Sequence, residues 1–170
     1  LNRTLVNFGH QPLAFEQIRP HVSHGGMALI RAGFKIEPDH PEFETYRLFL
    51  LDVYLKNICE NTRLFDGMTE LLSYLEQQNI AWGIVTNKPA WLTDPLMAAM
   101  QLEQRAVSIV SGDTCSEKKP HPMPILFACE QAGLDPLRCV YVGDAERDIQ
   151  AGKAAGCKTV TALFGYIDDA

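Results

Sequence analysis

The chain has 170 residues, of which 46% are hydrophobic and 21% charged, which is typical of one ordinary globular domain or of a core with a small insertion. Its formal net charge of -6 argues against nucleic acid or an anionic membrane as the main partner. No apolar run approaches the length of a membrane span, and the five cysteines show no Cys-x-x-Cys pairing, which indicates free thiols in a reducing compartment, most simply the cytoplasm.

The first sixty residues predict helices only. Apolar side chains recur at helical spacing, and prolines and glycines separate the segments. Gly9 closes the first segment, Gly33 the third, and Pro41 opens the fourth. Helices are therefore predicted at residues 1–8, 14–21, 27–32 and 41–60.

From residue 62 onward the pattern changes to short apolar strands that alternate with helices of about a dozen residues. Strands are predicted at residues 80–85, 107–110, 139–142 and 159–163. Helices are predicted at residues 67–78, 89–102, 122–132 and 148–155. This alternation predicts an α/β fold, a Rossmann-like parallel sheet with helices on both faces. The predicted domains are an all-helical domain at 1–61, with the tail of a core helix at 1–9, and an α/β core at 62–170.

Polar residues follow three of the predicted strands. They are Thr86-Asn87, Ser111-Gly112-Asp113 and Gly143-Asp144. Because the strands of a parallel sheet end at one edge, these groups are expected to converge. Thr86 and Asn87 offer a hydroxyl, an amide and backbone N–H groups for a phosphate, although they could equally cap the helix that begins at Pro89.

Two acids follow the strand at 139–142, which is expected to be buried on both faces. Asp144 ends this strand, and Asp148 lies one helical turn further on, so both carboxylates can face the same crevice. Such a pair suits Mg²⁺, which takes oxygen ligands. The plainer alternative makes Asp144 a turn residue and Asp148 a charge at a helix N-terminus.

Lys119 lies in the segment Lys118-Lys119-Pro120-His121-Pro122. The two prolines stiffen the chain just before a helix, so Lys119 could be held where it neutralises a phosphate and a neighbouring carboxylate. The alternative is a solvated basic loop.

Together, the strand ending in Asn87, the Lys119-Pro-His-Pro segment and the Gly-Asp144-Ala-Glu-Arg-Asp148 segment resemble the three ordered motifs of the haloacid dehalogenase superfamily of phosphohydrolases. The likeness covers residues 64–166, and the helical residues 1–61 look like the small cap domain of that superfamily. Leu64-Phe-Asp-Gly67, Thr86-Asn-Lys-Pro89 and Phe164-Gly-Tyr166 look most like the phosphoglycolate phosphatase group, with the N-acetylmuramic acid 6-phosphate phosphatases as close relatives.

The resemblance implies a role for each motif residue. Thr86 and Asn87 would bind the phosphoryl group, and Lys119 would balance the charge on its oxygens and on the nucleophile. Asp144 would bind Mg²⁺, and Asp148 would support that metal directly, through water or by pairing with Lys119. The substrate would be a small phosphate ester, hydrolysed through an aspartyl-phosphate intermediate.

The sequence departs from the superfamily in one respect. The amino-terminal Asp-x-Asp motif, which supplies the nucleophile and the general acid, is absent. We therefore expect the sequence to be a fragment, incomplete at both ends, that lacks the first, central strand and is inactive by itself. The alternatives are a sugar-phosphate phosphatase, a phosphomutase or dehalogenase of the same superfamily, and a non-catalytic phosphate-binding protein of the same fold. The sequence indicates no oligomeric state.

Overall fold

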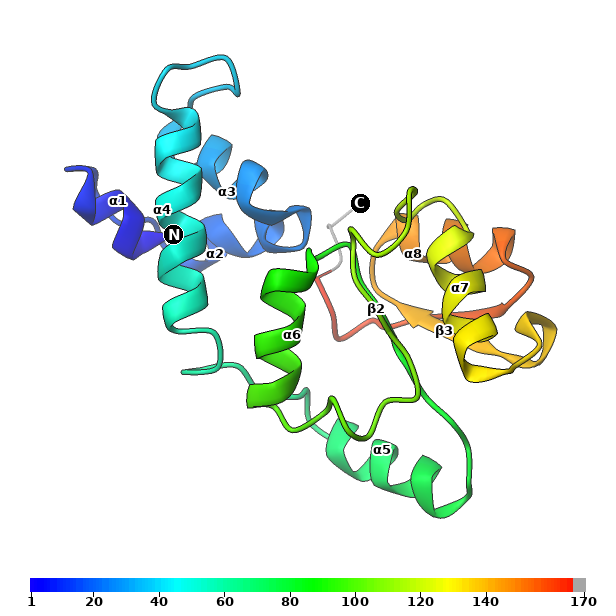
Figure 1. Cartoon of the computed structure of the whole chain (residues 1–170). Coiled ribbons are helices and arrows are strands. Elements are labelled where there is room, and N and C mark those ends of the chain that lie inside the picture. Colours follow the sequence, from blue (N-terminus) through cyan, green and yellow to red (C-terminus); the bar gives the residue numbers. More distant parts are fainter. Residues whose placement is uncertain (167–170) are drawn as a thin grey trace. The chain divides into compact units, whose positions relative to one another are not determined.

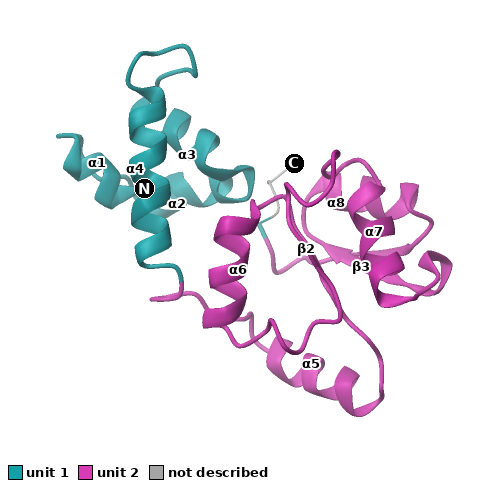
Figure 2. Ribbon diagram, in the orientation of Figure 1, with its two compact units in different colours: residues 1–58, 166–170 teal, residues 59–165 magenta. Residues whose placement is uncertain are grey.

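The computed structural model describes residues 1–166, which form two compact units (Figure 2). The first unit contains Leu1–Ile58 and Tyr166, and the second contains Cys59–Gly165. The last four residues of the predicted core, 167–170, lie outside the described residues. The assignment of the helical residues to a cap stays a prediction.

The described residues of the first unit form helices around an apolar core (Figure 1). The side chains of Leu5, Ile30 and Phe43 are almost completely buried in this core. The Phe8 and Tyr46 rings lie beside them, with centroids 4.3 Å apart. Its elements are α1 (Asn2–Asn7), α2 (Phe15–Ile18), η1 (Arg19–His24, a 3₁₀ helix), α3 (Gly25–Phe34) and α4 (Phe43–Lys56).

One glycine assignment in this unit was wrong. Gly33, predicted to end the third helix, lies inside α3. A side chain at Gly33 would come within 2.9 Å of Leu1, so this glycine allows close packing rather than a helix stop. The helix instead ends at Phe34, and Lys35 directly after it adopts a left-handed conformation with φ 57°.

The second unit alternates strands and helices, as predicted (Figure 1). In chain order its elements are α5 (Met68–Gln77), β1 (Ile84–Val85), α6 (Ala90–Ala99), β2 (Ile109–Val110), α7 (Met123–Ala132), η2 (Pro136–Arg138), β3 (Val140–Gly143), α8 (Glu146–Ala154) and β4 (Lys158–Thr161). Prolines and glycines set several of these bounds. Pro89 precedes α6, and Gly133 ends α7 in a left-handed conformation that glycine adopts without strain.

The strands form two parallel pairs, β1 with β2 and β3 with β4. Helix α7 packs on the first pair and α8 on the second. Between them lies one apolar cluster, in which Ile125 and Cys129 of α7 meet Ala151 of α8, with Val85 and Tyr141 packed against it. The two pairs thus share a covering layer, although no backbone ladder joins them.

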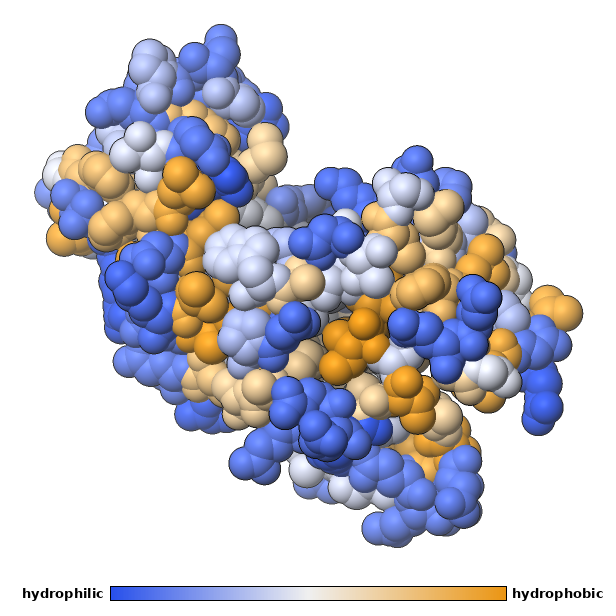
Figure 3. All heavy atoms as spheres, in the orientation of Figure 1, coloured by the Kyte–Doolittle hydropathy of each residue, from blue (hydrophilic) through white to orange (hydrophobic). Residues whose placement is uncertain are grey.

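Strand β3 is buried on one face only, so the prediction of burial on both faces was wrong. Tyr141 points toward the cluster under α7 and α8, whereas Val140 and Val142 are 56% and 57% exposed. Val160, paired with Val142 across the β3–β4 ladder, is 49% exposed. Helix α8 covers the opposite face. Hydrophobic residues are visible at the surface of the molecule in Figure 3.

Among the described residues, none of the helices is both long enough and apolar enough to cross a membrane.

Candidate functional site

Hydrogen bonds join the polar residues that follow β1 and β2 to the segment that contains Lys119. Asn87, just past β1, donates from its amide to the Lys119 carbonyl at 2.9 Å and accepts from the Lys119 N–H at 3.0 Å. The Gly112 N–H, past β2, donates to the Lys88 carbonyl at 2.8 Å. A side chain at Gly112 would collide with the Asn87 carbonyl, so the close approach of the two loops requires glycine there.

Lys119 is a buried lysine with three oxygen neighbours. Its side chain is 8% exposed, and Nζ lies 2.9 Å from Asp148 Oδ1, 2.7 Å from the Val85 carbonyl and 2.8 Å from the Tyr141 hydroxyl. Burial lowers the pKa of Lys119 below its ordinary value of 10.5, while the charges of Asp148 and Asp144 act in the opposite direction. The adjacent Lys118 is exposed, so Lys119 is the lysine of this pair that enters the interior.

Asp148 is the buried acid of the site, with 6% of its surface exposed. Its Oδ2 accepts the Ala145 N–H at 3.1 Å, which fixes the carboxylate at the start of α8. A side chain at Gly143 would collide with Asp148, so the glycine before Asp144 makes this approach possible. Oδ1 lies near the Lys119 ammonium but accepts no aligned hydrogen bond from the described residues.

Asp144 follows β3 directly and is half-buried. The backbone of Gly165 passes so close that any side chain there would collide with the Asp144 carboxylate. Asp148 lies in the first turn of α8, four residues after Asp144, and carboxylate oxygens of this kind suit a hard cation. Within residues 1–166, however, no three acidic, histidine or cysteine side chains gather as a complete metal site.

Thr86 has a local hydrogen bond in this structure. Its N–H donates to the Val110 carbonyl at 2.8 Å, and its hydroxyl accepts the Lys88 N–H at 3.1 Å. Asp113, another residue of the polar strand ends, accepts the Ala90 N–H at 2.8 Å at the start of α6, so it acts there as a helix cap. Lys119 is therefore in direct contact with Asn87 and Asp148, whereas the Thr86 hydroxyl bonds to the backbone of Lys88.

Sequence reasoning missed Tyr141. Its hydroxyl accepts from Lys119 Nζ at 2.8 Å and donates to the Val85 carbonyl at 3.1 Å. Burial, followed by the charge of Asp148, raises the pKa of Tyr141 above its ordinary value of 10.0. One signal was available. Tyr141 sits between Val140 and Val142, so strand alternation places it on the face opposite to the exposed valines.

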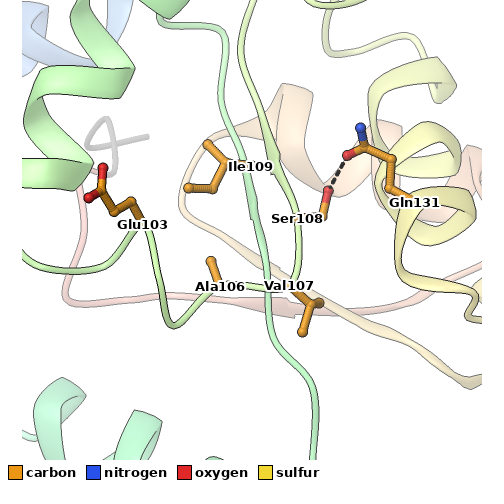
Figure 4. Close-up of a pocket in the computed structure, with 6 residues that line it drawn as sticks. All are labelled: Glu103, Ala106, Val107, Ser108, Ile109 and Gln131. Carbon is orange, nitrogen blue, oxygen red and sulfur yellow. Dashed lines mark hydrogen bonds between the residues drawn. The ribbon is translucent and has the colours of Figure 1, made fainter.

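A hollow of this unit lies elsewhere. Its lining includes Glu103, Ala106, Val107 and Ile109, and Ser108 donates a hydrogen bond to Gln131 Oε1 at 2.8 Å there (Figure 4). Ser108 precedes β2, whereas the groups around Lys119 follow the strands. The hollow is thus at the opposite end of β2 from the candidate site.

Fold and site together define an α/β protein with a lysine, an amide and two carboxylates at the carboxyl ends of parallel strands. This is where such sheets bind anionic ligands. The comparison with known families agrees. Residues 1–162 match the family of haloacid dehalogenase-like hydrolases, and the chain belongs to that family. The predicted membership, fold class and hydrolase activity class are confirmed.

Within this family, the chain is similar to proteins named as phosphatases. The chain is 38% identical over 159 residues to the N-acetylmuramic acid 6-phosphate phosphatase of Pseudomonas aeruginosa, covering 94% of this chain and 70% of that one. It is 39% identical over 166 residues to the phosphoglycolate phosphatase of Xanthomonas campestris, covering 98% and 75%. Among solved structures, a predicted phosphoglycolate phosphatase from Haemophilus somnus matches with a TM-score of 0.84 at 26% identity, covering 98% of this chain and 77% of that one.

Proposed function

We propose that this chain is the larger part of a Mg²⁺-dependent phosphatase that hydrolyses a small phosphomonoester. The observation that carries the proposal is the buried Lys119 at the carboxyl edge of the strands. Its backbone N–H donates to Asn87, and its ammonium lies 2.9 Å from Asp148 Oδ1. Phosphoryl transfer asks the protein mainly to position groups and to neutralise charge on the phosphoryl oxygens. A lysine held in this way can do so.

Each residue has a distinct role in this proposal. Thr86 and Asn87 bind the phosphoryl oxygens, and Lys119 neutralises their charge. Asp144 and Asp148 hold Mg²⁺, which supplies further neutralisation of the phosphate when bound. Two carboxylates close together in the chain support this assignment, because Mg²⁺ takes oxygen ligands.

We further propose that the nucleophilic carboxylate comes from a strand that lies between β1 and β3 and is not part of residues 1–170. Ile84 and Thr86 donate their N–H groups to the strand containing β2, so the backbone of Val85 faces the other way. The carbonyls of Cys139 and Gly143 accept hydrogen bonds from the strand containing β4. The backbone N–H and C=O groups of Val140 and Val142 therefore point toward the other edge of β3. Side chains alone, those of Lys119 and Tyr141, link Val85 to β3. This arrangement suits two strands separated by a third.

The proposed substrate is phosphoglycolate, with N-acetylmuramic acid 6-phosphate or another sugar phosphate as the alternative, because relatives named for both substrates are similar to this chain to nearly the same degree. A non-catalytic phosphate-binding protein is the alternative of another class. The free thiols of the described residues support a cytoplasmic location.

The test uses the intact protein that contains the added strand. We expect hydrolysis of an aryl phosphate that stops on chelation and returns with Mg²⁺. Among phosphoglycolate and N-acetylmuramic acid 6-phosphate, the substrate is the ester with the higher kcat/KM. Chelator-resistant activity on a haloacid would support a dehalogenase, and phosphate binding without turnover would support the non-catalytic alternative.

A further inference from the structure

The Lys119 ammonium has as many oxygen neighbours as it has N–H groups. An ammonium carries three donors, and the Val85 carbonyl, the Tyr141 hydroxyl and Asp148 Oδ1 lie 2.7, 2.8 and 2.9 Å from Nζ. A free lysine side chain samples many rotamers. Here three contacts from different segments restrict a single charged group to one position.

The Tyr141 side chain lies in the interior, where its hydroxyl contacts this ammonium. Its ring joins the apolar cluster under α7 and α8, and its centroid lies 5.5 Å from Lys119 Nζ. A side chain at Gly152 of α8 would collide with Thr159 and crowd Tyr141, so the glycine leaves room for the ring. A buried hydroxyl is costly without partners, and this one both accepts from Lys119 and donates to Val85.

We propose that Tyr141 is a positioning residue of the active site, which holds the Lys119 ammonium in the orientation that neutralises the transferring phosphoryl group. This inference rests on the proposed function. If the strand proposed above pairs with β1, one of its N–H groups would donate a hydrogen bond to the Val85 carbonyl. The Tyr141 hydroxyl and Asp148 then remain as the fixed partners of Lys119.

The variant Tyr141→Phe removes the hydroxyl and keeps the ring. In the intact protein we expect kcat to fall by about 10- to 100-fold, because a hydrogen bond to a charged group is lost where charge develops. We expect KM to change by less than about threefold, since the lysine remains buried beside Asp148. Activity is expressed per folded molecule, with the folded fraction taken from urea unfolding.

A double-mutant cycle separates positioning from a structural contribution. In the Lys119→Ala background, Tyr141→Phe should change kcat by less than about twofold, because the group that it orients is absent. The matched control is Tyr74→Phe on α5, an exposed tyrosine that should leave kcat unchanged in both backgrounds.

The outcomes are distinguishable. An equal loss of kcat from Tyr141→Phe in both backgrounds would make its role structural and overturn the inference. Unchanged kcat in Tyr141→Phe, with a strong loss in Lys119→Ala, would also overturn it while leaving the proposed function intact. Near-normal activity of Lys119→Ala would overturn the role of the lysine itself, and the inference with it.

Discussion

The hydrogen bonds between Asn87 and the Lys119 backbone predict a loss of stability whose size can be estimated from the structure. The variant Asn87→Ala removes both bonds, of 2.9 and 3.0 Å, that join the end of β1 to a segment 32 residues further along the chain. Each intramolecular hydrogen bond contributes about 1 kcal/mol net to stability. The expected loss is therefore about 2 kcal/mol, and more where the Lys119 backbone groups stay without a partner.

Tryptophan fluorescence can measure this loss of stability in the second unit, which contains Asn87. Both tryptophans, Trp82 and Trp91, lie in the second unit, so their emission follows the unfolding of the part that contains Asn87. For a chain of this size, about 2 kcal/mol corresponds to a decrease in Tm of roughly 4–8 °C. Urea unfolding followed by the same emission should give the free energy directly.

The control is Asn61→Ala, an exposed asparagine of the same unit, which should change stability by less than about 0.5 kcal/mol. If Asn87→Ala shifts the unfolding transition no further than Asn61→Ala does, the two bonds do not hold the lysine segment. The geometric basis of the site would then be wrong.

Four further results are expected. In the intact protein, Asp144→Asn should abolish Mg²⁺-dependent hydrolysis of an aryl phosphate with an unchanged circular dichroism spectrum, and activity near wild type would remove its metal role. Lys119→Ala should lower kcat by about 100-fold or more, whereas exposed Lys118→Ala should stay within twofold, and similar losses in both would refute the assigned register. Gly165→Ala should displace the Asp144 carboxylate, and so weaken activation by Mg²⁺ in a titration against wild type. Burial raises the pKa of the Cys129 thiol to about 12 from 9.0, so between these values the folded state keeps a proton that the unfolded state loses. The free energy of unfolding should then fall with pH by at most about 1.4 kcal/mol per unit for this thiol, and Cys129→Ala should reduce the slope measured by urea unfolding.

The sequence was most informative where the local chemistry is strong. The apolar residues before Gly143-Asp144 do form β3, and the alternation of strands and helices does define the second unit. Strand lengths were less predictable. The run at 80–85 yields only Ile84–Val85 as β1, because a strand extends only as far as its neighbours pair with it.

The site itself was partly predictable. Asp148 and Lys119 could be anticipated from their segments, but no local pattern shows that Lys119 is buried or that Asn87 binds its backbone, since these contacts join distant segments. Tyr141 was hidden for the same reason. Its role depends on which face of β3 meets α7 and α8, a property of the packed core.

The division of the strands into two pairs has a kinetic consequence. Each pair joins strands separated by a single helix, α6 in one case and α8 in the other, so each is a local folding event with low contact order. Bringing Val85 toward Tyr141 closes a far longer loop and is expected to occur later. Mutations within a pair should therefore slow refolding, whereas mutations at the contact between the pairs should mainly accelerate unfolding.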